Sequence, residues 1–588
     1  MQAKRILAMV VVAALGLSFH ARAADLTWNT GDGTWDTDTG NTPWNPGPDY
    51  FEAGDSVTFD DTGAGGTISI PANVAPASTT VTGTANYTFS GAGGITSGSL
   101  TKSGARILTL GNAANSFSGI TLAGGTISTA AANRLGSTGA GTTISVNGDA
   151  ALSVTASGVN IGLPMGIAAG VTATLTSSAW GSWYSGPITG DGSLRIVPGG
   201  GTWWFINNAS STFAGDIYVE AGTSFTGDSS MGASTKTIYW SGGNLSLNGT
   251  FDANRTLDIE GGGTFEGTGV WNGLVSGTYA GPLRLDGRLT LTNPGNSFTA
   301  SYFYVNTGEL AISDPGCVNH MRIEFRNGAL SSLKIIGTPT VSFDNDLRIG
   351  GYPIIIEEAD AVVNWTGPMV GVGLKRGPGT LAVYNYDNNS GGFTVEEGTL
   401  LVNDTATTGL RSHTVQDGAT LAGTGQIGLG GGYGVSVESG GTLGGTVTVT
   451  GGTGVTVADG GIVAPGESAG TLTLGSLVLN NGSILNFELD GPNVEGGDND
   501  FIRVNGALTL DGILNVTFTD TPVILQPYRL FGYTGALANN TLEVGTGLPK
   551  RGIIDWSVGG QVNLILIPEP ATAMLLGLAG LLPLWRRR

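Results

Sequence analysis

Short runs of alternating apolar and polar residues recur along most of the chain, and each run ends in a turn that contains glycine. Late in the chain the recurring phrase has a valine or leucine, polar residues, a glycine and another apolar residue. Its glycines are Gly398, Gly418, Gly440, Gly460 and Gly482, at steps of 20, 22, 20 and 22 residues. A regular step near 20 residues is typical of a solenoid.

This step has a direct physical interpretation. Two or three short strands, at about 3.3 Å per residue and joined by tight turns, use roughly 20 residues in one coil. Glycine and asparagine suit the corners because they tolerate positive φ, and Val, Ile, Leu and Thr suit the flat faces. Gly222, Gly242 and Gly262 carry the same step. We therefore predict an all-β fold, a right-handed parallel β-helix; an array of β-sandwiches is the alternative.

The composition excludes several other classes. Glycine makes up 101 of 588 residues and only 12% of residues are charged, so a helix-rich cytosolic enzyme is not expected. Collagen is excluded because the 23 prolines follow no triplet register. Apolar residues make up 40% of the chain, enough to build a core. The formal net charge of −20 disfavours nucleic acid as a partner.

The first 23 residues have the three parts of a signal peptide. Lys4 and Arg5 precede an apolar run at 6–17, and Ala21-Arg22-Ala23 forms an A-x-A cleavage pattern. We expect a signal helix, export through the Sec translocon and cleavage by signal peptidase after Ala23. A retained membrane anchor is the alternative.

The last 21 residues are organised in the same manner. Pro568-Glu569-Pro570 precedes an apolar run at 571–585 and the basic cluster Arg586-Arg587-Arg588. A helix of fifteen residues spans about 22 Å against a hydrocarbon core of roughly 30 Å, so it is a marginal anchor. By the positive-inside rule the arginines stay in the cytoplasm and the body lies on the other side of the membrane.

This arrangement resembles the PEP-CTERM sorting signal of Gram-negative bacteria. The resemblance covers about 21 residues, with all three parts in order. It implies recognition and removal of the tail by an exosortase-type membrane protease. The protein is then displayed on the cell surface or released into the extracellular matrix. An ordinary C-terminal membrane anchor is the alternative.

A longer motif is superimposed on the 20-residue step. It runs from Gly98-Ser-Leu-Thr-Lys102-Ser-Gly104 through Asn115-Ser-Phe117-Ser-Gly119 to Gly125-Thr-Ile127, and related phrases lead to Ala214, Thr299 and Ser390. These phrases resemble the autotransporter-associated β-strand repeat, also called the passenger-associated transport repeat, over about 120 of 588 residues. The resemblance implies a secreted β-helical passenger. It does not imply self-transport, because an autotransporter ends in a large membrane barrel, whereas we expect a short helix and three arginines here.

The predicted organisation has five parts: a signal peptide (1–23), an N-terminal β cap (24–95), the β-helix (96–485), C-terminal β coils or cap (486–567), and the sorting signal with a hydrophobic transmembrane helix (568–588). A solenoid must cover its first open coil. We assign this role to Trp28, Trp35 and Trp44, with sugar stacking as the alternative.

Two clusters are candidates for ligand binding. Trp180, Trp183, Trp203 and Trp204 are spaced so that an aromatic ladder on neighbouring coils could contact carbohydrate; packing inside the coils is the alternative. Asp490, Glu495, Asp498 and Asp500 lie in one loop that either holds calcium or is a solvated turn.

Candidates for catalysis are sparse. Cys317 and His320 make at most half a zinc site, and no zinc-protease motif or phosphate loop occurs. We assign no catalytic residue, metal ligand or cofactor. We expect a non-catalytic exported β-solenoid with a structural or adhesive role and extracellular polysaccharide as a candidate partner. The alternatives are a carbohydrate-binding surface protein and a polysaccharide lyase or hydrolase.

Overall fold

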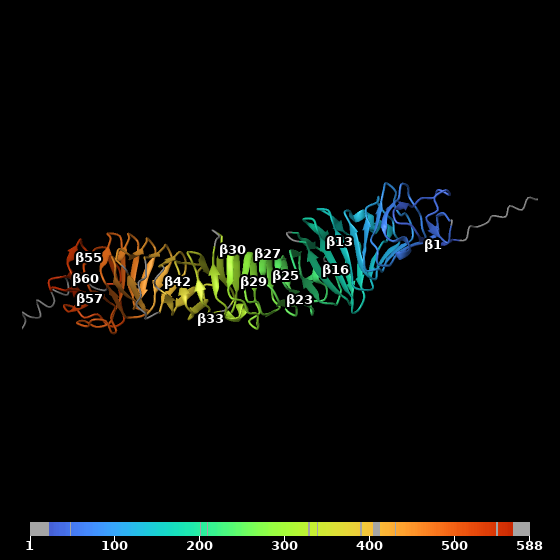
Figure 1. Ribbon diagram of the computed structural model, residues 1–588. Helices are drawn as coiled ribbons and strands as arrows, with labels where there is room; N and C mark the ends of the chain where they lie inside the picture. The colour runs from blue at the N-terminus through green and yellow to red at the C-terminus, as the bar shows by residue number, and fades with distance from the viewer. Residues whose placement is uncertain are drawn as a thin grey trace, which may run out of the picture. The chain divides into compact units, whose positions relative to one another are not determined.

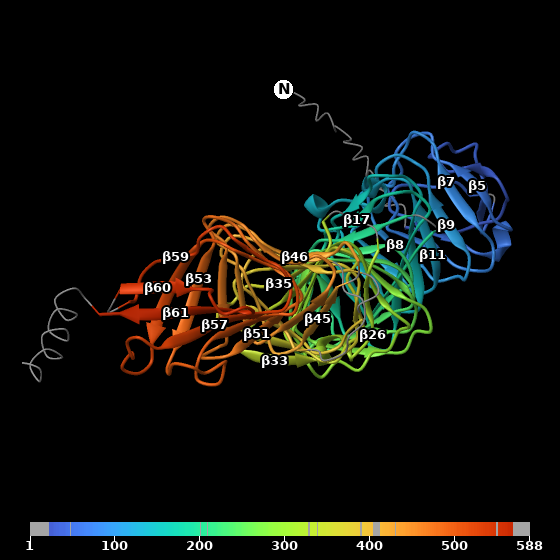
Figure 2. The same cartoon turned by 90° about the vertical axis from the view of Figure 1, so that its left-hand side faces the viewer.

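The computed structural model describes residues 23–47, 49–199, 202–208, 210–326, 330–337, 339–387, 391–403, 412–429, 431–548 and 551–568. The chain divides into two units, residues 1–193 and 194–588, and each is described separately. Both are built from short strands that pair with the equivalent strand of the next coil (Figures 1 and 2). The helices of the described ranges are short 3-10 turns: η1 (Asp61–Gly63), η2 (Ala132–Leu135), η3 (Thr138–Ala140), η4 (Asp228–Met231) and η5 (Pro315–Val318).

Unit 1 has two main sheets of parallel strands. The first contains β1 (Asp25–Trp28), β3 (Trp44–Asn45), β4 (Ser56–Phe59), β6 (Ser78–Val81), β8 (Ser99–Lys102), β10 (Gly119–Leu122), β12 (Ile144–Val146), β15 (Met165–Ile167) and β18 (Ile188–Gly190). The second contains β2 (Gly33–Thr34), β5 (Gly66–Ser69), β7 (Tyr87–Ser90), β9 (Ile107–Leu110), β11 (Gly125–Thr129), β13 (Ala150–Val154) and β16 (Thr172–Ser177). The short strands β14 (Asn160–Ile161) and β17 (Ser182–Tyr184) pair on a third side.

The register of unit 1 stacks like residues in columns. Alternate residues of each strand point inward, because side chains of a strand alternate between its two faces. One inward column contains Leu26, Val57, Thr79, Leu100, Ile120, Ile144, Met165 and Ile188, and all of them except Thr79 are apolar. An outward column contains Thr58, Thr80, Thr101, Thr121 and Ser145. The core of unit 1 is therefore a stack of aliphatic rungs with hydroxyl groups on its outer face.

Aromatic residues close the first coil. Trp28, Trp35 and Trp44 are at most 1% exposed. Their rings pack on one another and on Phe59, with ring centroids 5.0 to 5.9 Å apart. Strand β3 pairs antiparallel with β1 and forms the edge of the sheet. The buried rings offer no face for stacking on a sugar. Their position in the first coil fits the predicted capping role, which stays a prediction.

Unit 2 contains four sheets. The first has β19 (Ser193–Pro198), β21 (Ile217–Val219), β23 (Thr237–Trp240), β26 (Thr256–Ile259) and β28 (Leu274–Gly277). The second has β20 (Trp204–Ile206), β22 (Thr223–Phe225), β24 (Gly243–Leu247), β25 (Gly249–Phe251), β27 (Gly263–Trp271), β29 (Leu283–Leu291), β30 (Phe303–Ile312), β31 (Ile323–Phe325), β32 (Ser332–Ile335), β34 (Leu347–Arg348), β35 (Pro353–Ile356), β37 (Met369–Val370), β38 (Gly373–Arg376), β40 (Tyr386–Asp387), β41 (Phe393–Val395), β43 (His413–Val415), β46 (Gly434–Val437), β49 (Gly454–Val457), β52 (Leu477–Leu479), β55 (Leu508–Leu510) and β58 (Leu537–Asn539).

The other two sheets form the remaining sides of the later coils. One has β33 (Thr340–Phe343), β36 (Val362–Trp365), β39 (Thr380–Val383), β42 (Thr399–Val402), β44 (Thr420–Ala422), β47 (Thr442–Gly445), β50 (Ile462–Pro465), β53 (Ile484–Leu489), β56 (Ile513–Phe518) and β59 (Glu543–Val544). The other has β45 (Gln426–Leu429), β48 (Thr448–Gly451), β51 (Thr471–Leu474), β54 (Phe501–Val504), β57 (Pro527–Tyr533), β60 (Arg551–Asp555) and β61 (Gln561–Ile567).

The glycine step of the sequence corresponds to the coil. Gly398, Gly418, Gly440 and Gly460 have φ between 68° and 79°. The Gly440 N–H donates to Gly460 O at 2.9 Å, and the Gly460 N–H donates to Gly482 O at 2.7 Å. These hydrogen bonds stack the corners in register. The corners are glycines because glycine adopts the left-handed conformation without strain. The predicted parallel β-solenoid is confirmed and the sandwich array is wrong, whereas the right-handed winding stays a prediction.

The last coils of unit 2 are longer and end in an antiparallel hairpin. Asn515 of β56 bonds to Asn486 of β53, 29 residues earlier, because the loop that contains Asp490 and Asp500 enlarges this coil. Strand β61 pairs antiparallel with both β57 and β60, and β60 is the edge of this sheet (Figure 2). These longer coils begin near the predicted boundary at residue 486, although the five-part division itself stays a prediction.

Most of both terminal signals lies outside the described residues. The described ranges include Ala23 and Pro568 but not 1–22 or 569–588. Across these ranges, no helix has the length and the hydropathy that crossing a membrane requires. The signal helix and the hydrophobic C-terminal helix therefore stay predictions.

Candidate functional site

The tryptophans predicted to contact carbohydrate differ in exposure. In unit 1, Trp180 is 62% exposed and Trp183 of β17 is half-buried. In unit 2, Trp203 is half-buried with its ring 6.1 Å from that of Phe205, and Trp204 of β20 is fully buried. Trp204 thus packs in the core and offers no surface to a sugar. The other three stay candidates, of which Trp180 is the most accessible.

The carboxylates of the 490–500 loop do not converge. Asp500 is 1% exposed and accepts hydrogen bonds from the Gly470 N–H at 2.9 Å and the Glu488 N–H at 2.7 Å. Glu495 forms ion pairs with Arg529 and Arg503, and Asp490 accepts a hydrogen bond from the Thr519 hydroxyl at 3.0 Å. Among the residues with described positions, no group of three or more His, Cys, Asp or Glu is placed to hold a metal.

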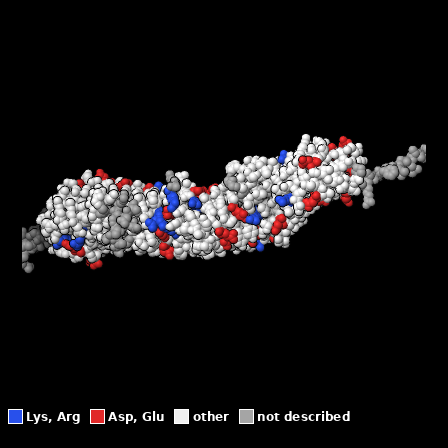
Figure 3. Space-filling view, viewed as in Figure 1, with Lys and Arg blue, Asp and Glu red and all other residues white. Residues whose placement is uncertain are grey.

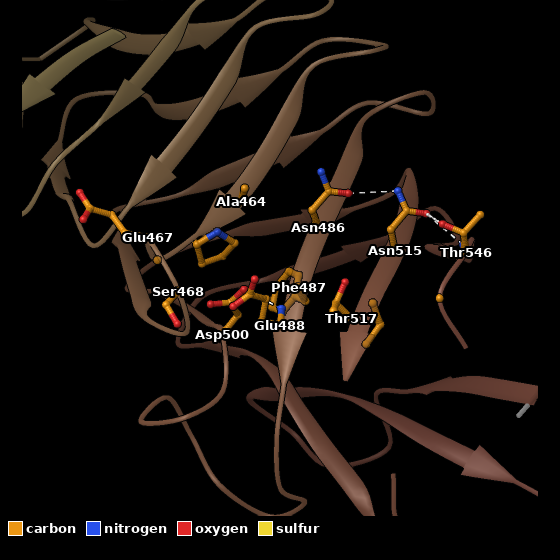
Figure 4. A pocket seen from close by; sticks show the side chains of 14 residues that line it. Ala464, Glu467, Ser468, Asn486, Phe487, Glu488, Asp500, Asn515, Thr517 and Thr546 are labelled. Atoms are coloured by element: carbon orange, nitrogen blue, oxygen red, sulfur yellow. Dashed lines mark hydrogen bonds between the residues drawn. The ribbon is translucent and has the colours of Figure 1, made fainter. Parts of the chain in front are cut away.

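A polar pocket lies next to this loop. Its volume is about 360 Å³, and it is lined by side chains from β50, β53, β56 and the loops that contain Glu467 and Thr546 (Figure 4). The Asn515 amide donates to Asn486 Oδ1 at 3.1 Å and accepts from the Thr546 N–H at 3.0 Å. Phe487 lines the pocket but is only 2% exposed. The pocket therefore offers amides, hydroxyls and carboxylates but no open aromatic ring.

Two carboxylates, Asp500 and Glu488, line this pocket (Figure 4). A pair of carboxylates is what a glycosidase would use, so we considered whether they could act as catalytic groups. Burial raises the pKa of Asp500 to about 7, although the hydrogen bonds from the Glu488 and Gly470 backbone oppose this rise. A glycosidase acid must present its carboxyl group to the glycosidic oxygen. Both Asp500 oxygens instead hold backbone N–H groups of separate segments, so the residue links β53 to the loop before β51. This geometry favours a structural role.

Cys317 and His320 perform separate structural roles. Cys317, in η5, is a free buried thiol whose Sγ lies 3.6 Å from the Ser313 hydroxyl. His320 is exposed and pairs with Asp344. The other histidine of the body, His413, is buried, and its Nδ1 accepts a hydrogen bond from the Phe393 N–H at 3.2 Å. Burial lowers the pKa of His413 to about 4, so it is neutral at pH 7.

The repeat motif places a lysine in the core of each unit. Lys102 lies between Val81 and Leu122 in an inward column of unit 1, and Lys375 lies between Ile354 and Val395 in unit 2. Both are at most 1% exposed, and burial lowers the pKa of each to about 8. Lys102 Nζ donates to Gly104 O, and Lys375 Nζ donates to Gly377 O at 2.6 Å. Each ammonium thus satisfies carbonyls of the turn that follows its strand.

A buried asparagine is the second structural feature that recurs with the motif in this chain. The Asn115 Oδ1 accepts from the Ile95 N–H at 2.8 Å, and its amide donates to Arg134 O at 2.6 Å. Asn296 repeats this geometry with the Val275 N–H and Cys317 O, both at 2.8 Å. Each side chain therefore bridges the preceding coil and the following coil. The motif residues stabilise the solenoid and do not form a ligand site.

Sequence reasoning missed an arginine–tyrosine surface on unit 2. Arg322 lies over the Tyr302 ring at 4.8 Å and Arg326 over the Tyr304 ring at 3.7 Å. The two tyrosine rings stack 5.5 Å apart. Glu324 pairs with both arginines, which leaves the ring faces covered. Arg322 follows Tyr302 by 20 residues, and Arg326 follows Tyr304 by 22. Each interval is the length of one coil, so the sequence contained a signal that could have placed each arginine beside its tyrosine.

Charged side chains are sparse on the viewed face. Figure 3 shows lysine and arginine close to acidic residues, on a surface that is otherwise mostly uncharged. Further ion pairs join Lys334 to Glu357 and Arg376 to Glu396. Because these bases are paired with acids, the surface is not a simple basic patch for a polyanion.

Comparison with known proteins gives one partial match. A stretch of 117 residues, 19% of this chain, is 46% identical to the adhesin BmaC autotransporter of Brucella suis biovar 1 (strain 1330). The matched stretch is 3% of that protein, so the chain spans a small part of its length. No model of a known protein family matches the chain. Over this stretch the chain is therefore similar to an autotransporter adhesin, which agrees with the autotransporter-like repeats and the β-solenoid.

Proposed function

We propose that the protein is an exported, non-catalytic β-solenoid that adheres to surfaces or to extracellular polymer. The observation that carries this proposal is the combination of a parallel β-solenoid with a stretch 46% identical to an autotransporter adhesin. Outward columns such as Thr58, Thr80, Thr101 and Thr121 present one hydroxyl per coil. Repeated weak contacts of this kind add up by multivalency.

Adhesion is tested with cells that lack the protein. Attachment to glass and to exopolysaccharide should fall and should return when the full chain is supplied. A complementing chain in which Thr58, Thr80, Thr101 and Thr121 are all replaced by Ala should reach the surface but restore less attachment, because this column then lacks its hydroxyl groups. Unchanged attachment without the protein would refute the proposal.

The route to the surface is the finer part of the proposal. The signal at residues 1–23 directs export through the Sec translocon, and the tail at 568–588 is removed by an exosortase-type protease. The test is the mass of the mature protein from cells with and without that protease. Loss of residues 1–23 in both strains, with loss of the tail only when the protease is present, supports sorting, whereas an uncut tail in both strains supports an ordinary anchor.

Carbohydrate binding is a second candidate, favoured by the 62% exposure of Trp180. Pull-down on immobilised glycans should weaken for Trp180→Ala combined with Trp183→Ala. The matched control is Trp556→Ala, which removes another exposed tryptophan far along the chain. Equal binding by all three proteins would remove this candidate, and release of sugar products would favour the enzyme alternative.

A further inference from the structure

Exposed apolar side chains gather in the last coils of unit 2. Among the described residues, seven of the twelve exposed large hydrophobic side chains lie between residues 494 and 558: Val494, Ile513, Val523, Leu525, Ile553, Trp556 and Val558. Single exposed apolar residues are ordinary, but a concentration of them marks an interaction surface.

Two of these seven side chains, Leu525 and Ile553, lie beside three neighbouring residues at the end of the terminal sheet. Ile553 of β60 pairs with Ile565 of β61, and Ile565 pairs with Pro527 of β57. In the next row Arg551 pairs with Ile567, and the Leu525 N–H donates to Leu566 O at 2.8 Å. We call Leu525, Pro527, Ile553, Ile565 and Ile567 the cap face. Leu525 is 59% and Ile553 49% exposed.

The opposite face of the same sheet already forms the core. Leu530, Leu564 and Leu566 are fully buried and Ile554 is 8% exposed. An antiparallel sheet with one buried face normally carries polar residues on the other. Here the row of Asp555, Asn563 and Arg529 on the outer face is polar, whereas the two rows nearer the end of β61 are apolar apart from Arg551. The packing of unit 2 does not explain these two rows, which form the cap face.

The charge of the cap face and the segment that follows β61 indicate what contacts this face. In the two rows of the cap face the single charged residue is Arg551, which is exposed. Strand β61 leads after Ile567 into Pro568-Glu569-Pro570 and the apolar run at 571–585. The run begins four residues beyond Ile567, and four residues reach at most about 14 Å. A bilayer that holds this run therefore lies within that reach of Ile567.

We propose that the cap face docks on the phospholipid surface of the membrane that holds the C-terminal run. The aliphatic side chains enter the boundary between headgroups and acyl chains, and Arg551 pairs with lipid phosphate. This inference rests on the proposed membrane anchoring. It adds that the body is held against the bilayer by its own terminal sheet until the tail is cut, after which the two contacts no longer act together.

The test uses the full chain with one introduced cysteine. Cys317 is buried, and the unsubstituted chain measures its background labelling. Ile553→Cys carries an environment-sensitive fluorophore on the cap face, and Thr340→Cys carries it on exposed β33 as the matched control. The chains are reconstituted in vesicles of phosphatidylcholine and phosphatidylglycerol that contain nitroxide-labelled lipid.

The expected result is a blue shift and quenching at position 553 and neither change at position 340. Arg551→Glu should reduce the quenching at 553 without changing the recovery of protein with vesicles. Recovery with vesicles but no quenching at 553 would overturn the docking and leave the anchoring intact. Failure to bind vesicles at all would overturn the anchoring as well. A blue shift without vesicles that grows with protein concentration would assign the face to a second copy of the chain.

Discussion

The N-terminal end of unit 1 and the C-terminal end of unit 2 are both closed by antiparallel strands, yet they treat apolar side chains differently. Trp28 of β1, Trp44 of β3 and the nearby Trp35 are buried. At the other end, Leu525 and Ile553 remain about half exposed on the sheet of β57, β60 and β61. One end is therefore completed by its own residues, whereas the other leaves an apolar face.

This difference teaches how the cap of a solenoid can serve two purposes. Any cap must stop the open coil from pairing with another chain. Aromatic side chains do this efficiently because each covers a large area. The C-terminal hairpin also satisfies the backbone of β57, but its outer face needs a partner outside the described residues. The comparison therefore separates stability, which both caps provide, from docking, which only the second cap provides.

The largest expected effect comes from Trp35→Ala in the N-terminal cap. The Trp35 ring lies 5.5 to 5.9 Å from those of Trp44, Phe51, Phe59 and Phe89. Its removal leaves a cavity and should destabilise the first coils by about 3–5 kcal/mol. Hydrogen exchange of peptides from residues 24–95 measures this loss. Trp556→Ala, which removes a 46% exposed ring, should change local stability by no more than about 0.5 kcal/mol.

The second expected effect is a pH dependence of opposite sign at two buried groups, Lys102 in unit 1 and Asp500 in unit 2. The folded pKa of Lys102 is lowered to about 8 from 10.5, so the unfolded chain binds more protons between these values and stability rises with pH there. The folded pKa of Asp500 is raised to about 7 from 3.8, so the folded chain binds more protons and stability falls as pH rises through that range.

Exchange-derived stability of each region against pH measures these slopes. Lys102→Met should remove the rise above pH 8 in unit 1, and Asp500→Asn should remove its contribution to the fall between pH 4 and 7 in unit 2. His413 acts against Asp500, because its lowered pKa makes stability rise from about pH 4 to 6.5. The difference between parent and variant isolates each group. Identical slopes in parent and variant would contradict the assignment.

The sequence predicts the coil better than it predicts which side chains enter the core. The steps between Gly398 and Gly482 reveal the coil because each coil needs a corner that tolerates positive φ. The run Trp203-Trp204-Phe205-Ile206 gives no such information, since four successive apolar residues do not reveal which ones point inward. Only the register of β20 with β22 shows that Trp204 and Ile206 are inside.

Lys102 illustrates the same limit for a charged residue. A lysine before a serine–glycine turn is ordinarily expected at the surface. The structure buries it because the turn carbonyls of Gly104 and Gly124 accept its hydrogen bonds. Likewise, the apolar cap face could not be recognised from sequence, because Leu525, Ile553 and Ile565 become neighbours only through antiparallel pairing.

A smaller effect is expected from Thr79→Val in an inward column of unit 1. Thr79 is 1% exposed and its hydroxyl has no hydrogen-bond partner. Valine has nearly the same shape without the buried hydroxyl, so the change should stabilise these coils by about 1 kcal/mol. The matched control is Thr80→Val, on the outward side of the same strand, which should have little effect. A loss of stability in Thr79→Val would show that the hydroxyl has an unrecognised partner.

The smallest expected effect is the most direct test of the contrast between the caps. Ile553→Thr on the cap face should change stability by no more than about 0.5 kcal/mol, because the side chain is already half exposed. Ile554→Thr, one residue further on the buried face, should be destabilising by about 1–3 kcal/mol, since it buries a hydroxyl. Urea denaturation of both variants, followed by hydrogen exchange of β60 and β61, measures the difference. Equal destabilisation would mean that the cap face packs within unit 2 and is not available to a bilayer.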